Sequence, residues 1–390
     1  MIHKQYLNSA PTLVRSPLRV AIVRRQKNIA LSMDVYADNL INELKQIRPE
    51  WEIMEIAPEP WGDDPENLWH SGNPLKKYYE RFWRHPRRVK RQMADIFHII
   101  DHTDGHVAYW LQKLGKPVVM TCHDLVQYVY PEILRNQSRF PALSMAVWKY
   151  SVRGLNSVDR IVTVSQNTAE DITRWLKIPS QQVETVANGV ESNFRSLPDN
   201  LVAKWRSQYS QSGEICLLNV GSTHQRKNIE TILQVVATLV ARGIAVRLWK
   251  LGSDFTPQQQ QQIRDLQIES SVSFLGQQNQ DALVHFYNAA DVLLAPSLYE
   301  GFGLTVLEAM ACGTPTIAAN ASSLPEVVGD AGILVEPLDV KAIADAIVRL
   351  QQDSDFRQTI VQKGLVRVRQ FTWKQAAVDL AAVYESLALS

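Results

Sequence analysis

Short apolar runs rich in β-branched residues alternate with amphipathic segments along almost the whole chain. A strand followed by a helix, many times over, is typical of βαβ units, which build parallel sheets with helices on both faces. The expected strands are Leu18–Val23, Ile96–Ile100, Val118–Thr121, Arg160–Val164, Val183–Val186, Ile215–Val220, Val246–Leu251, Val272–Leu275, Val292–Ala295, Thr316–Ala318 and Gly332–Val335. The expected helices include Ile229–Arg242, Gln280–Asn288, Leu304–Cys312 and Val340–Gln351. The pattern predicts a protein of the α/β class.

The alternation is interrupted in a polar stretch, residues 191–213, which has no strand pattern. We interpret this stretch as an interdomain connection with one short helix. A closed barrel is the competing arrangement of so many strands, and the interruption argues against it. We therefore expect two doubly wound, Rossmann-like domains, residues 1–195 and 196–372, facing each other across a cleft. In such sheets ligands bind at the carboxyl ends of the strands, so function is sought in strand-to-helix loops.

Bulk composition argues against several functions. The 390 residues carry a formal net charge of +1, which gives no reason to expect nucleic-acid binding. Cys122, Cys216 and Cys312 are far apart and odd in number, which suits a reducing compartment better than a disulfide framework. No apolar run approaches the roughly 20 residues that span a bilayer. We therefore expect a cytoplasmic protein.

A basic loop follows one expected strand in NVGSTHQRKNIETIL, which begins at Asn219. The strand ends at Gly221 and a helix begins near Asn228. Backbone N–H groups at this helix start, with Arg226 and Lys227 before it, would form a pocket for an anion. Arg offers a bidentate fork to phosphate oxygens, and Lys acts as a point charge. Taken alone, the segment is equally well explained as a solvated basic loop.

A loop with two glycines follows another expected strand in PSLYEGFGLTVLEAMACGTPTIA, which begins at Pro296. Gly301 and Gly303 allow the backbone to approach a ligand closely and to present amides to a diphosphate. Carboxylates beside a phosphate pocket repel phosphate, so we expect Glu300 and Glu308 to accept hydrogen bonds from sugar or ribose hydroxyls. Each such charged hydrogen bond contributes roughly 1.5–3 kcal/mol. Taken alone, Glu308 is better explained as a carboxylate that complements the helix dipole.

Together the two motifs resemble those of the retaining glycosyltransferases of family 4, which have the GT-B fold. The likeness covers about residues 215–375 and includes G-x-x-x-x-RKN, VSFLG, AADVLLAPSLYEGFGLTVLEAMACGTPTIAA and SSLPEVVGDAGILVEPLD. Its most specific part is the pair of glutamates with FG between them. The tail FTWKQAAVDLAAVYESL resembles the final helix of this family, which implies that residues 373–388 pack back on the N-terminal domain.

The resemblance implies roles for individual residues. Glu308 would bind the nucleotide ribose and Glu300 the hydroxyls of the transferred sugar, while Arg226 and Lys227 would neutralise the diphosphate. Many members have Arg directly after the loop glycine, where this chain has Ser222. The loop backbone would meet the diphosphate, and two residues of VSFLG would lie near the base. The implied donor-binding set is Gly221, Ser222, Phe274, Leu275, Gly301, Phe302, Gly303, Leu304, Thr305 and Glu308.

In the N-terminal half, KPVVMTCHDLV places His123 and Asp124 at the carboxyl end of an expected strand. Relatives have a histidine of a similar HD pair beside the reacting sugar, which implies a catalytic role for His123; otherwise it is an ordinary loop histidine. On the acceptor side we expect Asp124, Arg24, His102 and His106. The two histidines of IIDHTDGHVAYW are equally well explained as loop or helix-start residues. The loop that contains Arg24 lacks the glycines common in the family, so charge would replace close backbone approach there.

The segment Tyr78–Gln92 combines six Arg or Lys residues with aromatic neighbours and has no acid after Glu80. Relatives that act on lipid-linked acceptors meet anionic membrane with a similar face, where each cation contributes about 1 kcal/mol. One hypothesis is therefore peripheral contact with the inner face of the plasma membrane. The alternatives are a solvated helix face and contact with an anionic acceptor.

The resemblance implies transfer of a hexose from a UDP- or GDP-sugar to a hydroxyl of a saccharide or lipid-linked acceptor, with retention at the anomeric carbon. Helix amides and cations would stabilise the leaving diphosphate, so neither a metal nor a cofactor is expected. Asp353-Ser354-Asp355 spells the acid-x-acid pattern of metal-dependent transferases, but it lies in a polar turn and we interpret it as surface. The alternatives are a non-catalytic nucleotide-sugar-binding subunit and a sugar-nucleotide epimerase on the same fold.

Overall fold

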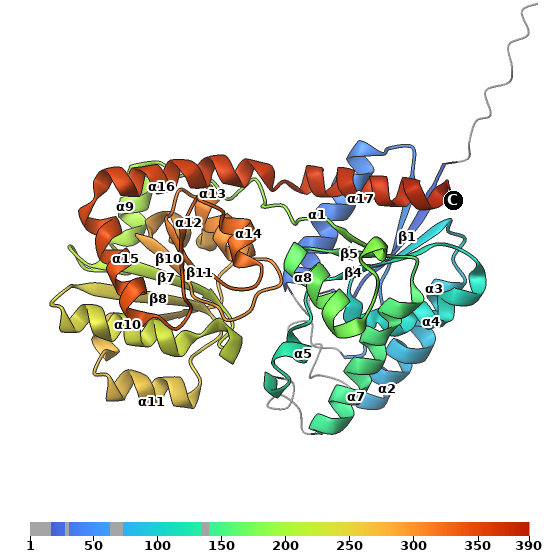
Figure 1. Ribbon diagram of the computed structural model, residues 1–390, viewed down its shortest axis with the longest axis horizontal. Helices are drawn as coiled ribbons and strands as arrows, with labels where there is room; N and C mark the ends of the chain where they lie inside the picture. The colour runs from blue at the N-terminus through green and yellow to red at the C-terminus, as the bar shows by residue number, and fades with distance from the viewer. Residues whose placement is uncertain (1–16, 28–30, 63–72, 134–139, 390) are drawn as a thin grey trace, which may run out of the picture.

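The chain folds into two parallel β-sheets in separate halves of the molecule (Figure 1). The computed structural model describes residues 17–27, 31–62, 73–133 and 140–389. The polar start of the first predicted domain, residues 1–16, lies outside these ranges. The predicted α/β class with two Rossmann-like sheets is confirmed.

Each sheet has six strands, and all paired strands are parallel. The first sheet contains β1 (Arg19–Val23), β2 (Glu52–Ile56), β3 (Ile96–Ile99), β4 (Val118–Cys122), β5 (Arg160–Thr163) and β6 (Val183–Thr185). The second contains β7 (Ile215–Gly221), β8 (Val246–Gly252), β9 (Val272–Gly276), β10 (Val292–Ala295), β11 (Thr316–Ala319) and β12 (Ile333–Val335). Their orders are β2-β1-β3-β4-β5-β6 and β12-β11-β10-β7-β8-β9.

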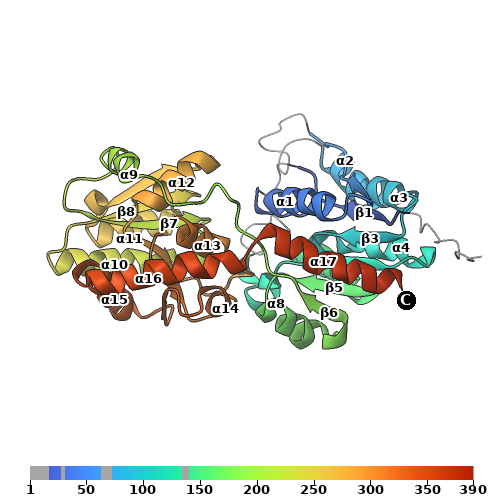
Figure 2. The same cartoon turned by 90° about the horizontal axis from the view of Figure 1, so that it is seen from above.

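Helices cover both faces of both sheets. In the first half they are α1 (Leu31–Ile47), α2 (Pro74–Tyr79), α3 (His85–Lys90), α4 (Ala108–Leu111), α5 (Val126–Val129), α7 (Pro141–Val152) and α8 (Gln166–Asp171). In the second half they are α9 (Asp199–Arg206), α10 (Ile229–Ala241), α11 (Pro257–Asp265), α12 (Gln280–Ala289), α13 (Leu304–Ala311), α14 (Leu324–Val328), α15 (Val340–Gln352) and α16 (Ser354–Arg367). The last helix, α17 (Trp373–Ala388), lies over the first sheet (Figure 2).

In each sheet, successive strands are added first on one side of the first strand and then on its other side, so the strand order has one reversal point. In the second sheet this point lies between β7 and β10, which are hydrogen-bonded neighbours although two strands separate them in sequence. The loops that leave the carboxyl ends of β7 and β10 therefore diverge to opposite faces and leave a crevice between them. These are the two loops that carry the predicted donor site.

The structure places strands at all eleven predicted positions and adds β2, which the sequence did not predict. The segment of β2 reads EIMEI, and as an edge strand it buries only part of its side chains. Its apolar residues are therefore separated by charged ones, unlike the continuous apolar runs of the central strands. The polar connection 191–213 contains one short helix, α9, as expected.

The chain crosses between the halves after β6 and again before α17, and the two crossing segments lie against each other. The backbone N–H of Val190 donates to the carbonyl oxygen of Phe371 at 3.1 Å. A Cβ added at Gly189 would lie 2.1 Å from the backbone nitrogen of Trp373, so only glycine fits there. These contacts set the direction in which α17 returns to the first sheet.

The helix α17 packs on α1 and the first sheet through a buried seam. The phenol of Tyr384 contacts Nδ1 of His98 on β3 at 2.6 Å, and Arg48 Nε donates to Glu385 at 2.9 Å. Leu380 is fully buried, whereas Val378 on the same helix is 40% exposed. The C-terminal helix is thus part of the core of the first half.

We predict that Leu380→Ala lowers the free energy of unfolding by about 2–5 kcal/mol, because it removes methyl groups and leaves a cavity in this seam. Urea denaturation of the full chain measures the change. Val378→Ala, on the exposed side of the same helix, is the matched control and should change the value by much less. Equal losses in the two variants would show that α17 does not stabilise the first half through this seam.

Candidate active site

The loops after β7 and β10 are fastened to each other by Asn228, the last residue of the RKN motif. Its backbone adopts a left-handed conformation with φ of 56°, which asparagine tolerates better than most residues. Its side-chain amide donates to the carbonyl oxygens of Pro296 at 2.9 Å and of Pro337 at 2.6 Å. The backbone N–H of Leu298 also donates to the carbonyl of Arg226 at 2.7 Å. The residues on either side of the crevice therefore form one connected unit.

This arrangement places Glu300 between two cations. Its Oε2 accepts a hydrogen bond from Arg226 Nη1 at 2.8 Å, and its Oε1 accepts one from Lys227 Nζ at 2.5 Å. Burial alone would raise the pKa of Glu300, but the charges of Lys227 and Arg226 outweigh it and hold the pKa at about 2. Glu300 is thus a permanently charged carboxylate at neutral pH, and it holds both cations at the base of the crevice.

The backbone of the Glu300–Gly303 loop is fixed by two serines of the SSLPEV segment. Ser322 Oγ accepts from the backbone N–H of Glu300 at 2.8 Å, and Ser323 Oγ donates to the carbonyl oxygen of Phe302 at 2.7 Å. Gly303 then begins α13 with φ of 125°, and no side chain caps this helix. The first N–H groups of an uncapped helix and its dipole favour an anion.

Glu308 lies one turn further along α13. Its Oε2 accepts a hydrogen bond from the Tyr287 hydroxyl at 2.5 Å. Burial raises the pKa of Glu308 to about 7, although the Tyr287 hydrogen bond and Lys227 oppose the rise. The two glutamates of the motif therefore differ in charge: Glu300 is ionised at neutral pH, whereas Glu308 is close to its midpoint.

The first half of the molecule completes the site, because the glycine loop touches the end of β4. A Cβ at Gly301 would lie 2.2 Å from the carbonyl oxygen of His123, so no larger residue fits there. Nearby, the Tyr299 hydroxyl donates to Asp171 at 2.6 Å and accepts from the backbone N–H of Leu125 at 3.3 Å. The halves are therefore in direct contact beside Glu300.

A second contact between the halves involves Glu326 on α14. Its carboxylate accepts from the backbone N–H groups of Gln166 at 2.8 Å and of Asn167 at 3.1 Å, at the start of α8. A carboxylate at a helix N-terminus is favoured by the helix dipole. The SSLPEV segment thus both fixes the glycine loop and holds the opposite half.

His123 is held in a defined orientation. Its Nε2 contacts the carbonyl oxygen of Ile100 at 2.8 Å, so Nε2 carries the proton and Nδ1 is left as the acceptor. Tyr36 packs edge-on against its ring, with centroids 4.7 Å apart. Burial lowers the pKa of His123, with Asp101 opposing the effect, so the ring is neutral at pH 7. His123 and Asp124 both lie beside the glycine loop, as the sequence predicts.

Three residues that we expect on the acceptor side, Arg24, His102 and His106, are instead buried and bonded to other groups of the protein. Arg24 is buried and forms ion pairs with Asp34 at 2.9 Å, Asp38 at 2.5 Å and Glu55 at 3.1 Å, so its charge is already neutralised. His106 contacts the carbonyl oxygen of Arg81 at 2.8 Å, and burial lowers its pKa to about 4.

His102 is also buried and lies behind His123. Its Nδ1 accepts from the His123 backbone N–H at 3.4 Å. His102 supports His123, whereas Arg24 and His106 serve packing and charge balance instead of facing an acceptor.

Four other predicted donor residues lie at the ends of two strands, β7 and β9. Gly221 ends β7 with φ of 128°, and Lys227 Nζ lies 3.6 Å from the position of an added Cβ. Ser222 follows it. Phe274 and Leu275 lie at the end of the edge strand β9, where the Phe274 side chain is 41% exposed.

The remaining three predicted donor residues form the turn into α13. The side chain of Phe302 is buried and contacts Phe371, with ring centroids 5.9 Å apart, so only its backbone faces the turn. Leu304 and Thr305 are the first two residues of α13.

Sequence reasoning missed the residues that orient the site. Asn228 and the serine pair Ser322 and Ser323 lie inside motifs that were recognised, but they were given no role. Tyr287 and Tyr299 also lie in recognised segments, an expected helix and the glycine-loop motif, and they too were given no role. A polar atom on a buried side chain needs a partner, and this rule is the signal that would have drawn attention to the two tyrosines.

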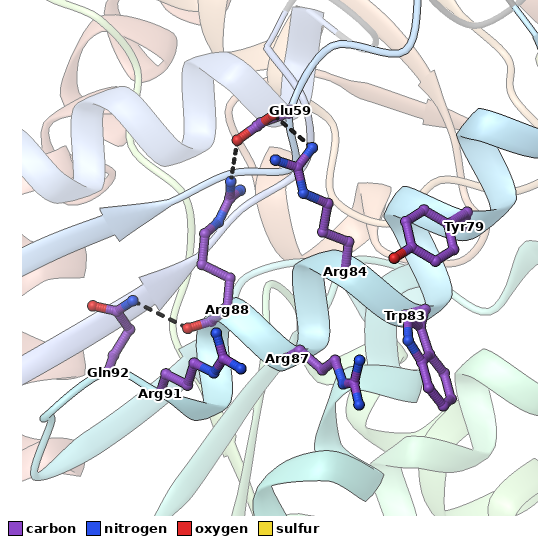
Figure 3. Close-up of a pocket in the computed structure, with 8 residues that line it drawn as sticks. All are labelled: Glu59, Tyr79, Trp83, Arg84, Arg87, Arg88, Arg91 and Gln92. Carbon is purple, nitrogen blue, oxygen red and sulfur yellow. Dashed lines mark hydrogen bonds and ion pairs between the residues drawn. The ribbon is translucent and has the colours of Figure 1, made fainter.

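The Tyr78–Gln92 segment forms α2, a π-helical turn at Glu80–Arg84 and α3, at the outer side of the first half. Figure 3 shows a hollow of about 470 Å³ here, lined by Glu59, Tyr79, Trp83, Arg84, Arg87, Arg88, Arg91 and Gln92. Glu59 accepts hydrogen bonds from Arg84 at 2.8 Å and Arg88 at 3.0 Å. Arg81 is paired with Asp104 at 2.8 Å. Three of the six cations are therefore paired with acids from elsewhere in the chain.

Comparison with known proteins places this site in a family. Residues 33–194 match the model of Glycosyltransferase Family 4, and residues 203–366 match that of Glycosyl transferases group 1. The chain is 30% identical over 310 residues to the O-antigen chain mannosyltransferase B of Escherichia coli, covering 78% of each protein. The chain belongs to glycosyltransferase family 4. This glycosyltransferase is also 27% identical to the serotype-specific mannosyltransferase WbdA of Escherichia coli, but it spans only 36% of that longer relative.

Solved structures show the fold. Sucrose-phosphate synthase from Thermosynechococcus elongatus superposes with a TM-score of 0.76 at 23% identity, over 96% of this chain and 100% of that chain. HepE from Anabaena, in complex with UDP-glucose, gives a TM-score of 0.74 at 17% identity, over 95% and 100%. The glycosyltransferase has the GT-B fold.

Two features of the described ranges of the glycosyltransferase concern its helices and its His, Cys, Asp and Glu side chains. Within those residues, no helix combines the length and apolar character needed to cross a bilayer. No group of three or more His, Cys, Asp or Glu side chains suited to a metal ion occurs in the same ranges. Asp353 of the acid-x-acid pattern caps α16 by accepting from the backbone N–H of Phe356 at 2.9 Å.

We predict that Glu308→Gln raises the melting temperature at pH 8 and leaves it unchanged at pH 4. The raised pKa of Glu308 means that burying the ionised form destabilises the fold, and this cost appears as pH rises from the unfolded value toward about 7. Gln resembles the protonated form and removes the cost. Thermal denaturation measures the difference, with the exposed Glu269→Gln as control. A lower melting temperature at pH 8 would contradict the assignment.

Proposed function

We propose that this glycosyltransferase transfers a hexose from a UDP- or GDP-sugar to a hydroxyl of a saccharide or lipid-linked acceptor, with retention and without a metal ion. The observation that carries the proposal is the Glu300 carboxylate held by Arg226 and Lys227 beside the uncapped start of α13. Two cations and a helix N-terminus at one place suit a diphosphate. The carboxylates beside it suit hydroxyl groups.

The donor would lie in the crevice between the loops after β7 and β10. Its diphosphate would meet the first N–H groups of α13 and the cations of Arg226 and Lys227. Glu308 would accept from ribose hydroxyls, and Glu300 from hydroxyls of the sugar. His123, across the contact between the halves, would place its Nδ1 acceptor near the transferred sugar.

In the proposed reaction the bond between the anomeric carbon and the diphosphate oxygen breaks, and its electron pair leaves with the diphosphate. The acceptor oxygen bonds to the same face of that carbon, and its proton passes to the departing phosphate oxygen. Positive groups preorganised around the diphosphate stabilise the charge that develops there. Both oxygens of Glu300 are engaged by cations, and its pKa is low, so it is poorly suited to act as a covalent nucleophile.

The names of relatives guide the choice of sugar and acceptor. One relative is an O-antigen chain mannosyltransferase, and a protein of the same fold was solved in complex with UDP-glucose. We therefore propose mannose or glucose as the transferred sugar and a growing polysaccharide as the acceptor. Binding of the donor without turnover would instead identify a non-catalytic subunit, and interconversion of two nucleotide sugars would identify an epimerase.

We predict that the wild type transfers or hydrolyses sugar from radiolabelled GDP-mannose or UDP-glucose. Lys227→Met should lower kcat about 10²–10³-fold, because it removes a charge that stabilises the leaving group. Glu300→Gln and His123→Ala should lose activity as well, while the exposed Glu269→Gln should not. EDTA should leave the rate unchanged, and NMR of the product should find the anomeric configuration of the donor. Retained turnover in both Glu300→Gln and His123→Ala would refute the site.

Peripheral contact with an anionic membrane is the second part of the proposal. Tyr78, Tyr79 and Trp83 are about half exposed, at 50%, 58% and 46%. The Arg87 guanidinium lies 4.6 Å from the centre of the Trp83 ring, and Arg87 has no carboxylate partner among the described residues. Exposed aromatic rings beside unpaired cations suit the interface of an anionic bilayer.

We predict that Arg87→Ala with Arg91→Ala weakens binding to vesicles containing anionic phosphatidylglycerol by about tenfold or more, since each cation contributes about 1 kcal/mol near the surface. Cosedimentation with vesicles at low salt measures the binding. Arg84→Ala is the matched control, because Glu59 already neutralises Arg84 and its removal should weaken binding less. Equal effects in the two variants, or equal binding to neutral vesicles, would overturn the proposal.

A further inference from the structure

Lys250 is a buried cation that no step above uses. It lies on β8, its side chain is 0% exposed, and it is among the largest fully buried side chains of the described residues. Its ammonium donates to two backbone carbonyls, those of Gly221 at 2.6 Å and Leu251 at 2.7 Å. Within the described ranges it forms no ion pair. A buried charge without a counter-ion is unfavourable, so this lysine calls for an explanation.

The position of Lys250 links it to the candidate donor site. Gly221 ends β7, and its carbonyl oxygen is so close to β8 that a Cβ at Gly252 would lie 2.5 Å from it. On the other side of Gly221, Lys227 Nζ would be 3.6 Å from an added Cβ. Two ammonium groups thus converge on one glycine at the end of β7.

The Lys250 ammonium also fixes the orientation of the Gly221–Ser222 peptide, which follows the end of β7. The bond between Gly221 and Ser222 is trans, as are all peptide bonds in the described chain. In a planar trans peptide the C=O and the N–H point in opposite directions. Because Lys250 holds the Gly221 carbonyl oxygen, the Ser222 N–H points away from Lys250.

Three cations, Arg226, Lys227 and Lys250, meet at this turn, and Glu300 forms ion pairs with the first two. The other titratable groups that face this region are Asp254 after β8, His224 before the RKN motif, Glu308 on α13 and Asp124 after β4. Asp254 directs its carboxylate to the backbone N–H of Phe255 at 2.6 Å. Among the described residues no carboxylate is paired with Lys250, so its charge remains to complement an anionic group bound at the turn.

We infer that Lys250 is a positioning residue for the donor: it fixes the Gly221–Ser222 peptide and supplies, through the protein interior, positive charge for the diphosphate. The inference rests on the proposed donor site. It deepens that proposal, because Lys250 acts from beneath the turn and does not need to touch the sugar.

The protonation of Lys250 makes this role measurable. Burial lowers the pKa of Lys250 to about 8, with Lys227 adding to the fall and Asp254 opposing it. A bound diphosphate favours the charged form, so binding raises the pKa of Lys250. The affinity for the diphosphate is then fully present below pH 8 and falls as the pH rises through that value. The fall is at most about tenfold per pH unit, because one proton is linked to binding. The phosphate itself is fully ionised there, because its second pKa is about 6.

The test measures binding of UDP, GDP and ADP by isothermal titration calorimetry at about pH 7.5 and 9.5. Variants are Lys250→Met, which removes charge and donor, and Lys250→Gln, which keeps a donor but no charge. Lys341→Met, on the exposed surface of α15, is the control. We expect at least tenfold weaker binding at pH 7.5 in both Lys250 variants. The nucleotide affinity of both variants should change less between the two pH values than that of the wild type. Near pH 8.5 the wild type alone should take up a proton when the nucleotide binds.

Two outcomes would overturn different claims. If the wild type binds none of the three nucleotides, the proposed donor site fails. If it binds one of them, and both Lys250 variants keep its affinity or its full dependence on pH, the donor site stands and the role of Lys250 fails. The proton uptake of the wild type tests the inference even if a variant does not fold.

Discussion

The ion pairs of Glu300 with Arg226 and Lys227 depend on a feature of topology. Two cations in the loop after β7 can meet a carboxylate in the loop after β10 only because these strands are neighbours at the reversal point of the sheet. Asn228 fastens the two loops, and the serines of the SSLPEV segment fix the backbone on which Glu300 lies. The result is a charged group held in place before any ligand arrives, which is what electrostatic preorganisation requires.

The same loop also connects the two halves. Gly301 contacts the end of β4, Tyr299 bonds to Asp171, and Glu326 meets the start of α8. The carboxylate of Glu300, held by two cations, and the contact with the opposite half therefore share one short stretch of chain. The return of α17 to the first sheet, over the crossing at Val190 and Phe371, ties the halves together at a second place. Any relative motion of the halves must break polar contacts next to Glu300.

Much of the fold, and the way the two loop motifs come together, could be predicted because the signals are local. The central strands are continuous apolar runs, and the motif residues of the donor loops lie within a few positions of one another. The strand β2 was missed because two of its five residues are charged, and only its pairing at the edge of the sheet makes it a strand. The acceptor side was predicted less well, because Arg24 and His106 look available in sequence and are engaged in the folded chain.

The sequence by itself determined the α/β class, the two sheets and the clustering of Glu300, Gly301, Gly303, Arg226 and Lys227 around one crevice. Periodicity and short motifs are properties of residues that are close in sequence, so they can be recognised from the sequence alone. Only the tertiary structure decided which charges remain available. Glu59 pairs with two arginines of the basic segment, Arg24 forms ion pairs with three acids, and Lys250 is buried beneath Gly221 without an acidic partner among the described residues. Charge pairing depends on distance in space, and residues far apart along the chain set that distance.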